Sequence, residues 1–318
     1  MILYIALFIA SCFILSWLSS RLVKTLIDIA KYLGWREFII AFFVMSFATS
    51  LPNLFVDLNA ALHGMPQLAF GDVVGGNLAD LTLVMAIAVL FGKSSSMRAN
   101  SRMVQTSAIF TVVIALLPLL LVFDGSLGRT DGVILLLTFL LYSFWLFSKE
   151  DRFKKTYSNK IKNPIKGFTG FLKNLGQIIF LLLLLLAASQ AVVSSAQYFS
   201  TKLGISLSLV GILIVGLGNC FPEMYFSIVS ARKGQNWMVL GDLMGSVIIC
   251  ATLVLGIIAI VAPFQIPDFS PFFIARTFLA IASIIYFVFV STDRKITRKE
   301  GLLMLGVYVI FLLTEIFL

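Results

Sequence analysis

The acidic residues of this chain are unusual in where they stand along the sequence. Of its fifteen aspartates and glutamates, five lie well inside long apolar segments: Asp57, Asp72, Asp80, Glu223 and Asp242. No lysine or arginine stands at a comparable depth, so none of the five has an obvious ion-pair partner in the sequence. A carboxylate at the centre of a bilayer costs about 2.5–3.5 kcal/mol on insertion scales. Acids gathered there predict a bound cation, a proton or a water-filled cavity.

All five acids fall within two stretches that resemble each other, residues 46–87 and 216–257. The offset between matching positions is 170 residues throughout, and no gap is needed. The matches include Pro52 with Pro222, Ala61 with Ala231, Gly64 with Gly234, Gly71-Asp72 with Gly241-Asp242, Gly75 with Gly245, and Thr82-Leu83-Val84 with Thr252-Leu253-Val254. Two arbitrary apolar segments would not agree to this extent, so the chain contains an internal repeat.

Each stretch contains a proline, Pro52 or Pro222, directly before a polar residue, Asn53 or Glu223. Proline lacks an N–H group and displaces the carbonyl one turn back, so it interrupts a helix. In lipid a freed carbonyl needs a partner, which a cation, a water molecule or a hydroxyl group can provide. Surroundings rich in oxygen favour hard cations such as Ca²⁺, Na⁺ or Mg²⁺.

The composition requires a membrane around these motifs. The chain has 318 residues, of which 60% are hydrophobic and only 12% charged, and its mean hydropathy is +1.03. A soluble protein needs about a quarter of its residues to be charged, so most of this surface must face lipid. Ten segments are long enough to cross a bilayer, at approximately 2–20, 38–61, 67–91, 104–123, 132–148, 176–199, 205–231, 237–262, 271–290 and 301–317.

The net charge of +9 comes from residues concentrated in particular loops. With ten spans and the N-terminus outside, 21 of the 24 lysines and arginines fall on the cytoplasmic side. Only Arg129, Lys202 and Arg276 remain outside. This asymmetry follows the positive-inside rule, places both termini outside, and indicates a lipid bilayer rather than nucleic acid as the partner of the positive charge. The absence of a large regulatory domain favours a prokaryotic inner membrane.

A basic linker at residues 149–173 separates a first repeat, residues 1–148, from a second, residues 174–318. Five spans precede the linker, so the second repeat enters the membrane in the opposite sense. We therefore expect an all-α membrane protein with two inverted five-helix repeats. Transporters of this construction hold their substrate near the midplane, where interrupted helices of the two repeats meet. The glycines at positions 71, 75, 76, 241 and 245 are expected to allow close helix contact.

The two stretches resemble the paired alpha repeats of sodium/calcium exchangers, which belong to the calcium/cation antiporter superfamily. The residues that carry the resemblance are Thr49-Ser50-Leu51-Pro52-Asn53 and Gly71-Asp72-Val73-Val74-Gly75-Gly76-Asn77 in the first repeat, and Gly218-Asn219-Cys220-Phe221-Pro222-Glu223 and Gly241-Asp242-Leu243-Met244-Gly245-Ser246 in the second. With the spacing, the ten spans and the linker, the resemblance covers nearly the whole chain. It implies that the second and third helices of each repeat surround the ions.

The resemblance also implies a set of cation ligands. Glu223 stands at the family's second calcium-binding glutamate, and Asn53 takes the place of the first. The other matches are Thr49 and Asn219 at paired threonine positions, Ser50 and Cys220 at paired serine positions, Gly76 and Ser246 at a small polar position, and Asp80 and Cys250 at a later Asn or Asp position. Asp57 lies four residues beyond Asn53, hence on the same helical face, and is a further candidate ligand. Asp72 and Asp242 replace residues that are commonly Asn, and each has a structural alternative as a helix cap.

The function that the resemblance implies is secondary active antiport, with Ca²⁺ exchanged against Na⁺ by alternating access and without a cofactor. The first and sixth helices would slide past a core formed by the other eight. Two alternatives stay open. Burial favours the neutral form of a carboxyl group, which would suit a cation/H⁺ exchanger. The loss of the first-repeat glutamate at Asn53 would suit a degenerate, non-transporting membrane subunit. No motif of an enzyme is present.

Overall fold

The computed structural model describes residues 1–32, 40–94, 96–148, 167–266 and 270–317. These residues form an all-helical bundle with two short strand pairs, β1 (Ser96–Arg98) with β4 (Lys295–Thr297) and β2 (Ser126–Leu127) with β3 (Phe264–Gln265). Most of the predicted linker, residues 149–166, lies outside the described residues. The predicted all-α class is confirmed.

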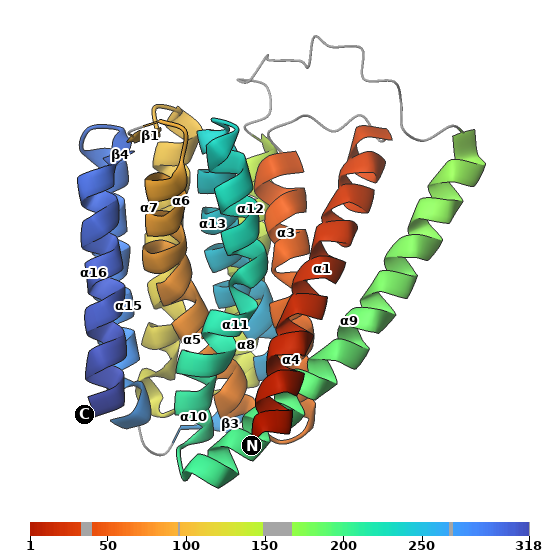
Figure 1. Cartoon of the computed structure of the whole chain (residues 1–318), viewed down its shortest axis with the longest axis vertical. Helices are drawn as coiled ribbons and strands as arrows, with labels where there is room; N and C mark the ends of the chain where they lie inside the picture. Colours follow the sequence, from red (N-terminus) through yellow and green to blue (C-terminus); the bar gives the residue numbers. More distant parts are fainter. Residues whose placement is uncertain (33–39, 95, 149–166, 267–269, 318) are drawn as a thin grey trace.

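Nine helices within the described residues are long and apolar enough to cross a membrane, and each coincides with a predicted span. The first two residues of the remaining predicted span, 38–61, lie outside the described residues. From residue 40 on it is a broken helix, formed by a π-helical turn η1 (Ile40–Met45), α3 (Ser46–Thr49) and α4 (Leu51–Leu62). The two ends of the chain lie at the same end of the bundle (Figure 1), as an even number of spans requires. Which end faces outward stays a prediction.

The first repeat comprises α1 (Ile2–Tyr32), the broken helix just described, α5 (Pro66–Ala79) with η2 (Asp80–Val84) and α6 (Met85–Phe91), α7 (Arg102–Leu121) with the 3₁₀ turn η3 (Val122–Asp124), and α8 (Arg129–Ser148). The second comprises α9 (Gly167–Leu203), α10 (Leu207–Val210), η5 (Gly211–Val215), α11 (Gly216–Asn219), α12 (Phe221–Arg232), α13 (Asn236–Ile249), η6 (Cys250–Val254), α14 (Leu255–Val261), α15 (Ser270–Ser291) and α16 (Arg298–Phe317).

The repeat read from the sequence is also a repeat of secondary structure. The offset of 170 residues carries α3 onto α11, α4 onto α12, α5 onto α13, η2 onto η6 and α6 onto α14. The turn between α4 and α5 lies at the same end as the termini, whereas its counterpart between α12 and α13 lies at the opposite end (Figure 1). The two repeats are therefore inverted, as predicted.

The helices that carry the motifs form the centre of the bundle. In an apolar 18-residue stretch of Pro66–Phe91 and of Asn236–Val261, 83% and 78% of the residues are buried. The corresponding share is 28–39% for α1, α7, α8, α9, α15 and α16. Helices that carry breaks and polar side chains at membrane depth need such protection from lipid. The site therefore lies inside a shell of apolar helices.

Glycines bring the central helices of the two repeats into backbone contact. A Cβ added to Gly75 would overlap the Ile212 carbonyl in η5, and one added to Gly211 would overlap the Leu68 carbonyl in α5. Side chains at these positions would force the two repeats apart, so the expectation of close contact is confirmed for Gly71 and Gly75 of α5.

The helices α1 and α9 pack along each other at one side of the bundle and run obliquely across it (Figure 1). They contain 31 and 37 residues and are longer than the spans predicted for them. At 1.5 Å per residue the longer one extends about 55 Å, which exceeds a hydrocarbon core of about 30 Å, so it must be tilted.

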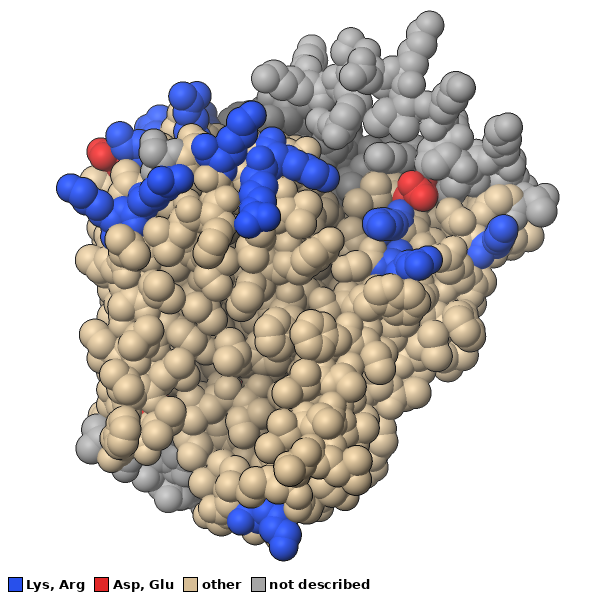
Figure 2. All heavy atoms as spheres, viewed as in Figure 1, with Lys and Arg blue, Asp and Glu red and all other residues tan. Residues whose placement is uncertain are grey.

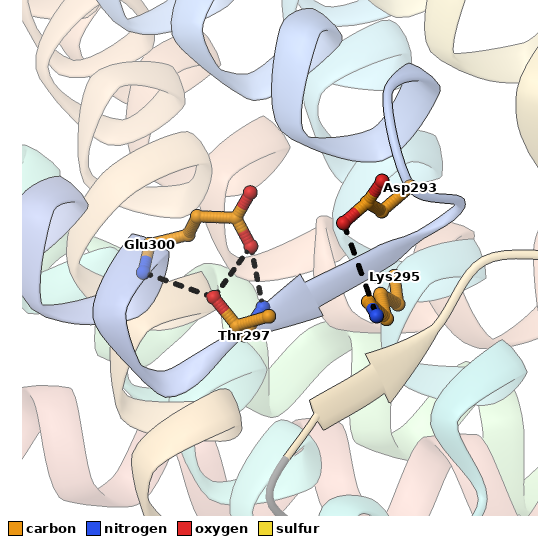
Figure 3. A network of polar contacts seen from close by, with 4 residues as sticks. All are labelled: Asp293, Lys295, Thr297 and Glu300. Atoms are coloured by element: carbon orange, nitrogen blue, oxygen red, sulfur yellow. Dashed lines mark hydrogen bonds and ion pairs between the residues drawn. The ribbon is translucent and has the colours of Figure 1, made fainter.

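Charged side chains gather at the ends of the bundle and leave an uncharged belt between them (Figure 2). Most of the basic residues lie at the end opposite the termini. At that end Glu300 caps α16, because its carboxylate accepts from the Thr297 N–H at 2.6 Å and from the Thr297 hydroxyl at 2.7 Å (Figure 3). Asp293 and Lys295, 3.8 Å apart, form the one ion pair between two described residues.

Candidate cation-binding site

The two broken helices meet at the centre of the bundle. The first is interrupted at Ser50, between α3 and α4, and the second at Cys220, between α11 and α12. Each break is followed by a proline in the first turn of the next helix, where a missing N–H is tolerated. The predicted interruptions are therefore present, and they place Asn53 and Glu223 in the first turn after each break.

Each break is tied to the central helix of the other repeat by a buried hydrogen bond. Thr49 Oγ1 in the first repeat donates to Asp242 Oδ1 in α13 at 3.2 Å. Asn219 Nδ2 in the second repeat donates to Asp72 Oδ2 in α5 at 2.6 Å. These two bonds are equivalent under the 170-residue repeat.

The alternative interpretation of Asp72 and Asp242 as helix caps is wrong. Asp72 lies in the middle of α5 and Asp242 in the middle of α13, and both carboxylates are fully buried. Each accepts a hydrogen bond from the other repeat rather than from the end of its own helix. Each carboxylate therefore joins the two repeats at a break.

Closer to the breaks, hydroxyl and thiol groups follow the same pattern. Ser50 Oγ lies 3.2 Å from Ser246 Oγ, and Ser246 donates to Glu223 Oε1 at 3.3 Å. At the equivalent place in the other half, Cys220 Sγ lies 3.5 Å from the carbonyl oxygen of Gly76. The break residues of both repeats thus face polar groups of the opposite repeat.

The positions that follow the breaks form two equivalent corners with different chemistry. We call Glu223 and Asp80 the acidic corner, where Asp80 faces both Ser246 and Cys220 and lies within electrostatic reach of Glu223. The equivalent residues Asn53 and Cys250 form the neutral corner, where Asn53 Nδ2 approaches Cys250 Sγ at 3.5 Å. Asp80 and Cys250 each open a π-helical turn, so the backbones of the two corners match.

The side chains of the acidic corner have unused acceptor atoms. Glu223 and Asp80 are 1% and 3% exposed, and Glu223 Oε2 and Asp80 Oδ1 have no hydrogen-bond partner among the described residues. Asn53 Oδ1 in the neutral corner is unpartnered as well. A buried acceptor without a partner is costly, so these oxygens are suited to a cation.

The nine residues predicted as ligands are all buried, and eight of them lie at the breaks and corners: Thr49, Ser50, Asn53, Asp80, Asn219, Cys220, Glu223 and Ser246. Asp57 lies one turn further along α4, next to Asp72 rather than in the acidic corner. Whether any of the nine binds a cation stays a prediction.

One buried acid among the described residues lies outside the two repeated stretches. Glu315 near the end of α16 is 7% exposed, and its Oε2 atom has no partner among the described residues. The sequence signal was weak, because Glu315 stands only two residues before the end of the last predicted span, 301–317.

The site offers a hard cation oxygen ligands, of which few carry a charge. Within the described part of the chain, no three His, Cys, Asp or Glu side chains come together in a way that could hold a metal ion. A divalent ion would have two carboxylates in the acidic corner and would depend on neutral hydroxyl, amide and carbonyl oxygens for its other ligands.

Comparisons with known proteins agree with this architecture. The family model described as "Sodium/calcium exchanger protein" matches residues 3–148 and 173–317. The sodium/calcium exchanger MaX1 of Methanosarcina acetivorans is 25% identical over 92% of this chain and 93% of its own length. The inner membrane protein YrbG of Escherichia coli is 24% identical over 98% and 96%. The vacuolar cation/proton exchanger 3 of Arabidopsis thaliana is 25% identical over 75% and 58%.

A solved structure of the sodium-calcium exchanger NCX_Mj has the same fold. It superposes with a TM-score of 0.69 and covers 98% of both chains at 23% sequence identity. The match extends from the first helix to the last, so both repeats and their inverted arrangement are shared.

Proposed function

The chain belongs to the sodium/calcium exchanger family, and from this premise we propose that it exchanges Ca²⁺ for Na⁺ at the breaks between its two repeats. The family resemblance expected from the motifs is confirmed, and the chain is an integral membrane protein and a secondary cation antiporter rather than an enzyme. The identity of the ions is the proposal. A prokaryotic inner membrane is the expected location, given relatives such as the Escherichia coli protein.

The acidic corner carries the proposal. Glu223 and Asp80 bring two negative charges together in a buried place, and each has an oxygen without a hydrogen-bond partner among the described residues. Two carboxylates match the charge of one Ca²⁺ or of two Na⁺. Ions that use the same carboxylates exclude each other, and this competition couples their movements in opposite directions.

The neighbouring groups supply neutral oxygens. Ser246 and Ser50 form a hydroxyl chain that ends on Glu223, and Asn53 Oδ1 has no partner among the described residues. Thr49, Asn219 and Cys220 lie at the two breaks. These residues, with Asp57, constitute the proposed ligand set. Access would alternate by movement of α1 and α9, which pack along each other beside the central helices.

The test is ⁴⁵Ca²⁺ uptake into proteoliposomes that contain the full chain and an outward Na⁺ gradient. Uptake should require internal Na⁺ and should disappear in Glu223→Gln. The matched control is Glu315→Gln, which removes a charge from another buried glutamate that lies in α16, outside the two breaks. If both variants lose uptake equally, the loss does not report on the acidic corner.

Cation/proton exchange is the second candidate function. The observation that favours it is the number of buried carboxyl groups at the site, and one relative is a vacuolar cation/proton exchanger. The same vesicles with a pH gradient in place of the Na⁺ gradient decide between the two. Uptake driven by the pH gradient alone would overturn Na⁺ coupling, and no uptake under either gradient would support a non-transporting protein.

A further inference from the structure

The prolines at the breaks free one backbone carbonyl in each repeat. In an α-helix the carbonyl of residue i accepts from the N–H group of residue i+4, and proline has no N–H group. Pro52 therefore frees the Ala48 carbonyl, and Pro222 frees the Gly218 carbonyl. In the first repeat the freed carbonyl has a partner in another helix, because Ser19 Oγ of α1 donates to it at 2.9 Å. A buried hydroxyl group thus fastens α1 to the first broken helix.

The helix α9 is fastened to the same broken helix by a second buried bond. Asn59 Nδ2 of α4 donates to Ser189 Oγ of α9 at 3.1 Å. Asn59 is 6% exposed and Ser189 is fully buried. Ser189 Oγ in turn donates to the Leu186 carbonyl in its own helix at 2.8 Å. Because α1 and α9 pack along each other, the two bonds together hold this pair of helices against α3 and α4.

The contacts of α1 with the second broken helix are of another kind. The ring of Phe13 in α1 stacks on that of Phe221 in α12, with centroids 6.1 Å apart. Phe8 and Cys12 of α1 lie against Gly218, where an added Cβ would stand 3.0 Å and 2.9 Å from their nearest atoms. Apolar contact has no preferred direction and permits sliding, whereas a hydrogen bond requires one geometry. The bonds of Ser19 and Ser189 therefore select the first broken helix.

The offset of 170 residues also relates α1 to α9. It carries buried residues of α1 onto buried residues of α9, namely Leu15 onto Leu185, Ser19 onto Ser189 and Leu22 onto Val192. The two serines are therefore equivalent, as are the two freed carbonyls. Asn59 is the exception, because its equivalent in α12 is Val229, whose side chain has no donor. The second repeat cannot form the counterpart of the bond that Asn59 makes.

We propose that Asn59 is a positioning residue that favours the described arrangement over the opposite one of the transport cycle. The inference rests on the proposed function, in which access alternates by movement of α1 and α9. Asn59 acts through Ser189, to which it donates, and not on the transported ion. It therefore sets how often each side of the membrane reaches the site, whatever ion the site binds.

Alternating access requires a second arrangement, in which the pair of helices packs against the other broken helix. Because the two repeats are inverted and share one backbone pattern, exchanging their roles yields that arrangement. Ser189 then faces the freed Gly218 carbonyl, whereas Ser19 faces Val229, which offers it no donor. Asn59, a buried amide, is left without its partner. The described arrangement thus has two bonds to a broken helix, and the opposite one has a single bond.

The experiment measures the ratio of the two arrangements in the purified full chain in lipid nanodiscs. Spin labels are attached to Leu203→Cys at the end of α9 and Phe317→Cys at the end of α16, and double electron–electron resonance gives the distances between them. Both residues are exposed, and the three native cysteines are buried. Choline replaces Na⁺ and Ca²⁺ is omitted, so that no transported ion sets the ratio.

Two substitutions should shift the ratio in the same direction. Asn59→Val removes a bond from the described arrangement, and Val229→Asn provides a donor for Ser19 in the opposite one. Each should favour the opposite arrangement by about three- to tenfold, the range for one hydrogen bond between membrane helices. The variant with both substitutions should shift the ratio by the product of the two factors. If the wild type shows a single distance, this variant should show a second one.

Two serine variants are the controls. Ser195→Ala removes a buried hydroxyl group of α9 that donates to the Ala191 carbonyl in its own helix at 2.7 Å, and it should leave the ratio unchanged. Ser189→Ala removes one bond from each arrangement, so its ratio should stay near that of the wild type although the bond to Asn59 is lost. Val229→Asn leaves the native bond in place, and it decides the test alone if Asn59→Val does not fold.

Three results would overturn the inference: an unchanged ratio in Val229→Asn, shifts of the two single variants in opposite directions, and one distance shared by the wild type and the variant with both substitutions. The ⁴⁵Ca²⁺ uptake assay keeps the proposed function separate. Uptake without a shift in the ratio rejects the role of Asn59 and leaves Na⁺/Ca²⁺ exchange standing. A shift in the ratio without uptake leaves the role of Asn59 standing and rejects the assignment of the ions.

Discussion

The acidic corner and the neutral corner occupy equivalent places in the two repeats, yet they offer a cation very different surroundings. Glu223 and Asp80 bring two carboxylates together, whereas Asn53 and Cys250 bring an amide and a thiol. The backbones do not account for this difference, because both corners combine the first turn after a helix break with the first residue of a π-helical turn.

The comparison separates what the fold supplies from what the side chains supply. The fold supplies two broken helices, two π turns and two hydrogen bonds between the repeats, all in equivalent pairs. Of the four residues that form the two corners, the two carboxylates both stand in one corner, and this removes the symmetry. A Ca²⁺ ion bound by these two carboxylates should therefore lie nearer to Glu223 than to Asn53.

The largest effect is expected when the charge is moved from one corner to the other. The double variant Glu223→Asn with Asn53→Glu keeps the number of glutamates but leaves Asp80 without its partner. Ca²⁺ binding should weaken by at least about 100-fold, which corresponds to roughly 3 kcal/mol for a lost interaction with a charged group. Equilibrium binding of ⁴⁵Ca²⁺ measures the change.

The complete inversion is the control for that experiment. Adding Asp80→Cys and Cys250→Asp to the double variant rebuilds the acidic pair in the other corner. Because the backbones match, Ca²⁺ binding should return to within about tenfold of the wild-type value, a difference of 1.4 kcal/mol. Failure of the inversion to improve on the double variant would show that the two corners are not equivalent.

A smaller loss is expected for Asp80→Asn. Asp80 shares its surroundings with Ser246 and Cys220, so an amide oxygen at this position can still act as a neutral ligand. Ca²⁺ affinity should fall about tenfold, the equivalent of roughly 1.4 kcal/mol. A loss as large as that of Glu223→Gln would show that the two acids act as an inseparable pair.

A gain is expected when the neutral corner is made acidic. Asn53→Glu restores a carboxylate where the family has one, and a third negative charge nearby should tighten Ca²⁺ binding by up to about tenfold at low ionic strength. Transport should become slower, since a more tightly bound ion leaves less readily. Unchanged affinity would indicate that the side chain at position 53 does not reach the bound ion.

The smallest effect concerns the two bonds between the repeats. Thr49→Val leaves a buried oxygen of Asp242 without its donor and should lower the free energy of unfolding by about 1–3 kcal/mol. Asn219→Leu should cost more, because the bond to Asp72 is shorter, at 2.6 Å against 3.2 Å. Thermal unfolding in detergent measures both. Thr111→Val is the control, since Thr111 donates to the Ser107 carbonyl within its own helix. An equal fall in melting temperature for Thr111→Val would show that the bonds between the repeats stabilise the fold no more than a bond within one helix.

Much of this architecture could be predicted from the sequence. Hydropathy located the spans, and the constant offset of 170 residues located both the repeat and the breaks at Pro52 and Pro222. The same alignment predicted that Asn53 and Glu223 are equivalent. These features are local or periodic, so a single sequence is sufficient to recognise them.

The contacts between the repeats could not be predicted in the same way. The partners Thr49 and Asp242 are 193 residues apart, and nothing in their local sequence distinguishes a carboxylate that caps its own helix from one that binds another. The π turns at Asp80 and Cys250 also lack a sequence signal, because their residues are ordinary helix residues. Tertiary packing decides both features.

The scarcity of ion pairs has a practical consequence for biochemical work. Between two described residues, only Asp293 and Lys295 form one, and both are on the surface. Raising the ionic strength screens surface charges and weakens such pairs, but here little of the folding free energy depends on them. A ligand that binds only the folded state raises the melting temperature by mass action. A difference in melting temperature between NaCl and choline chloride at equal ionic strength should therefore report Na⁺ occupancy directly, which makes thermal unfolding a simple assay for screening ions and buffers.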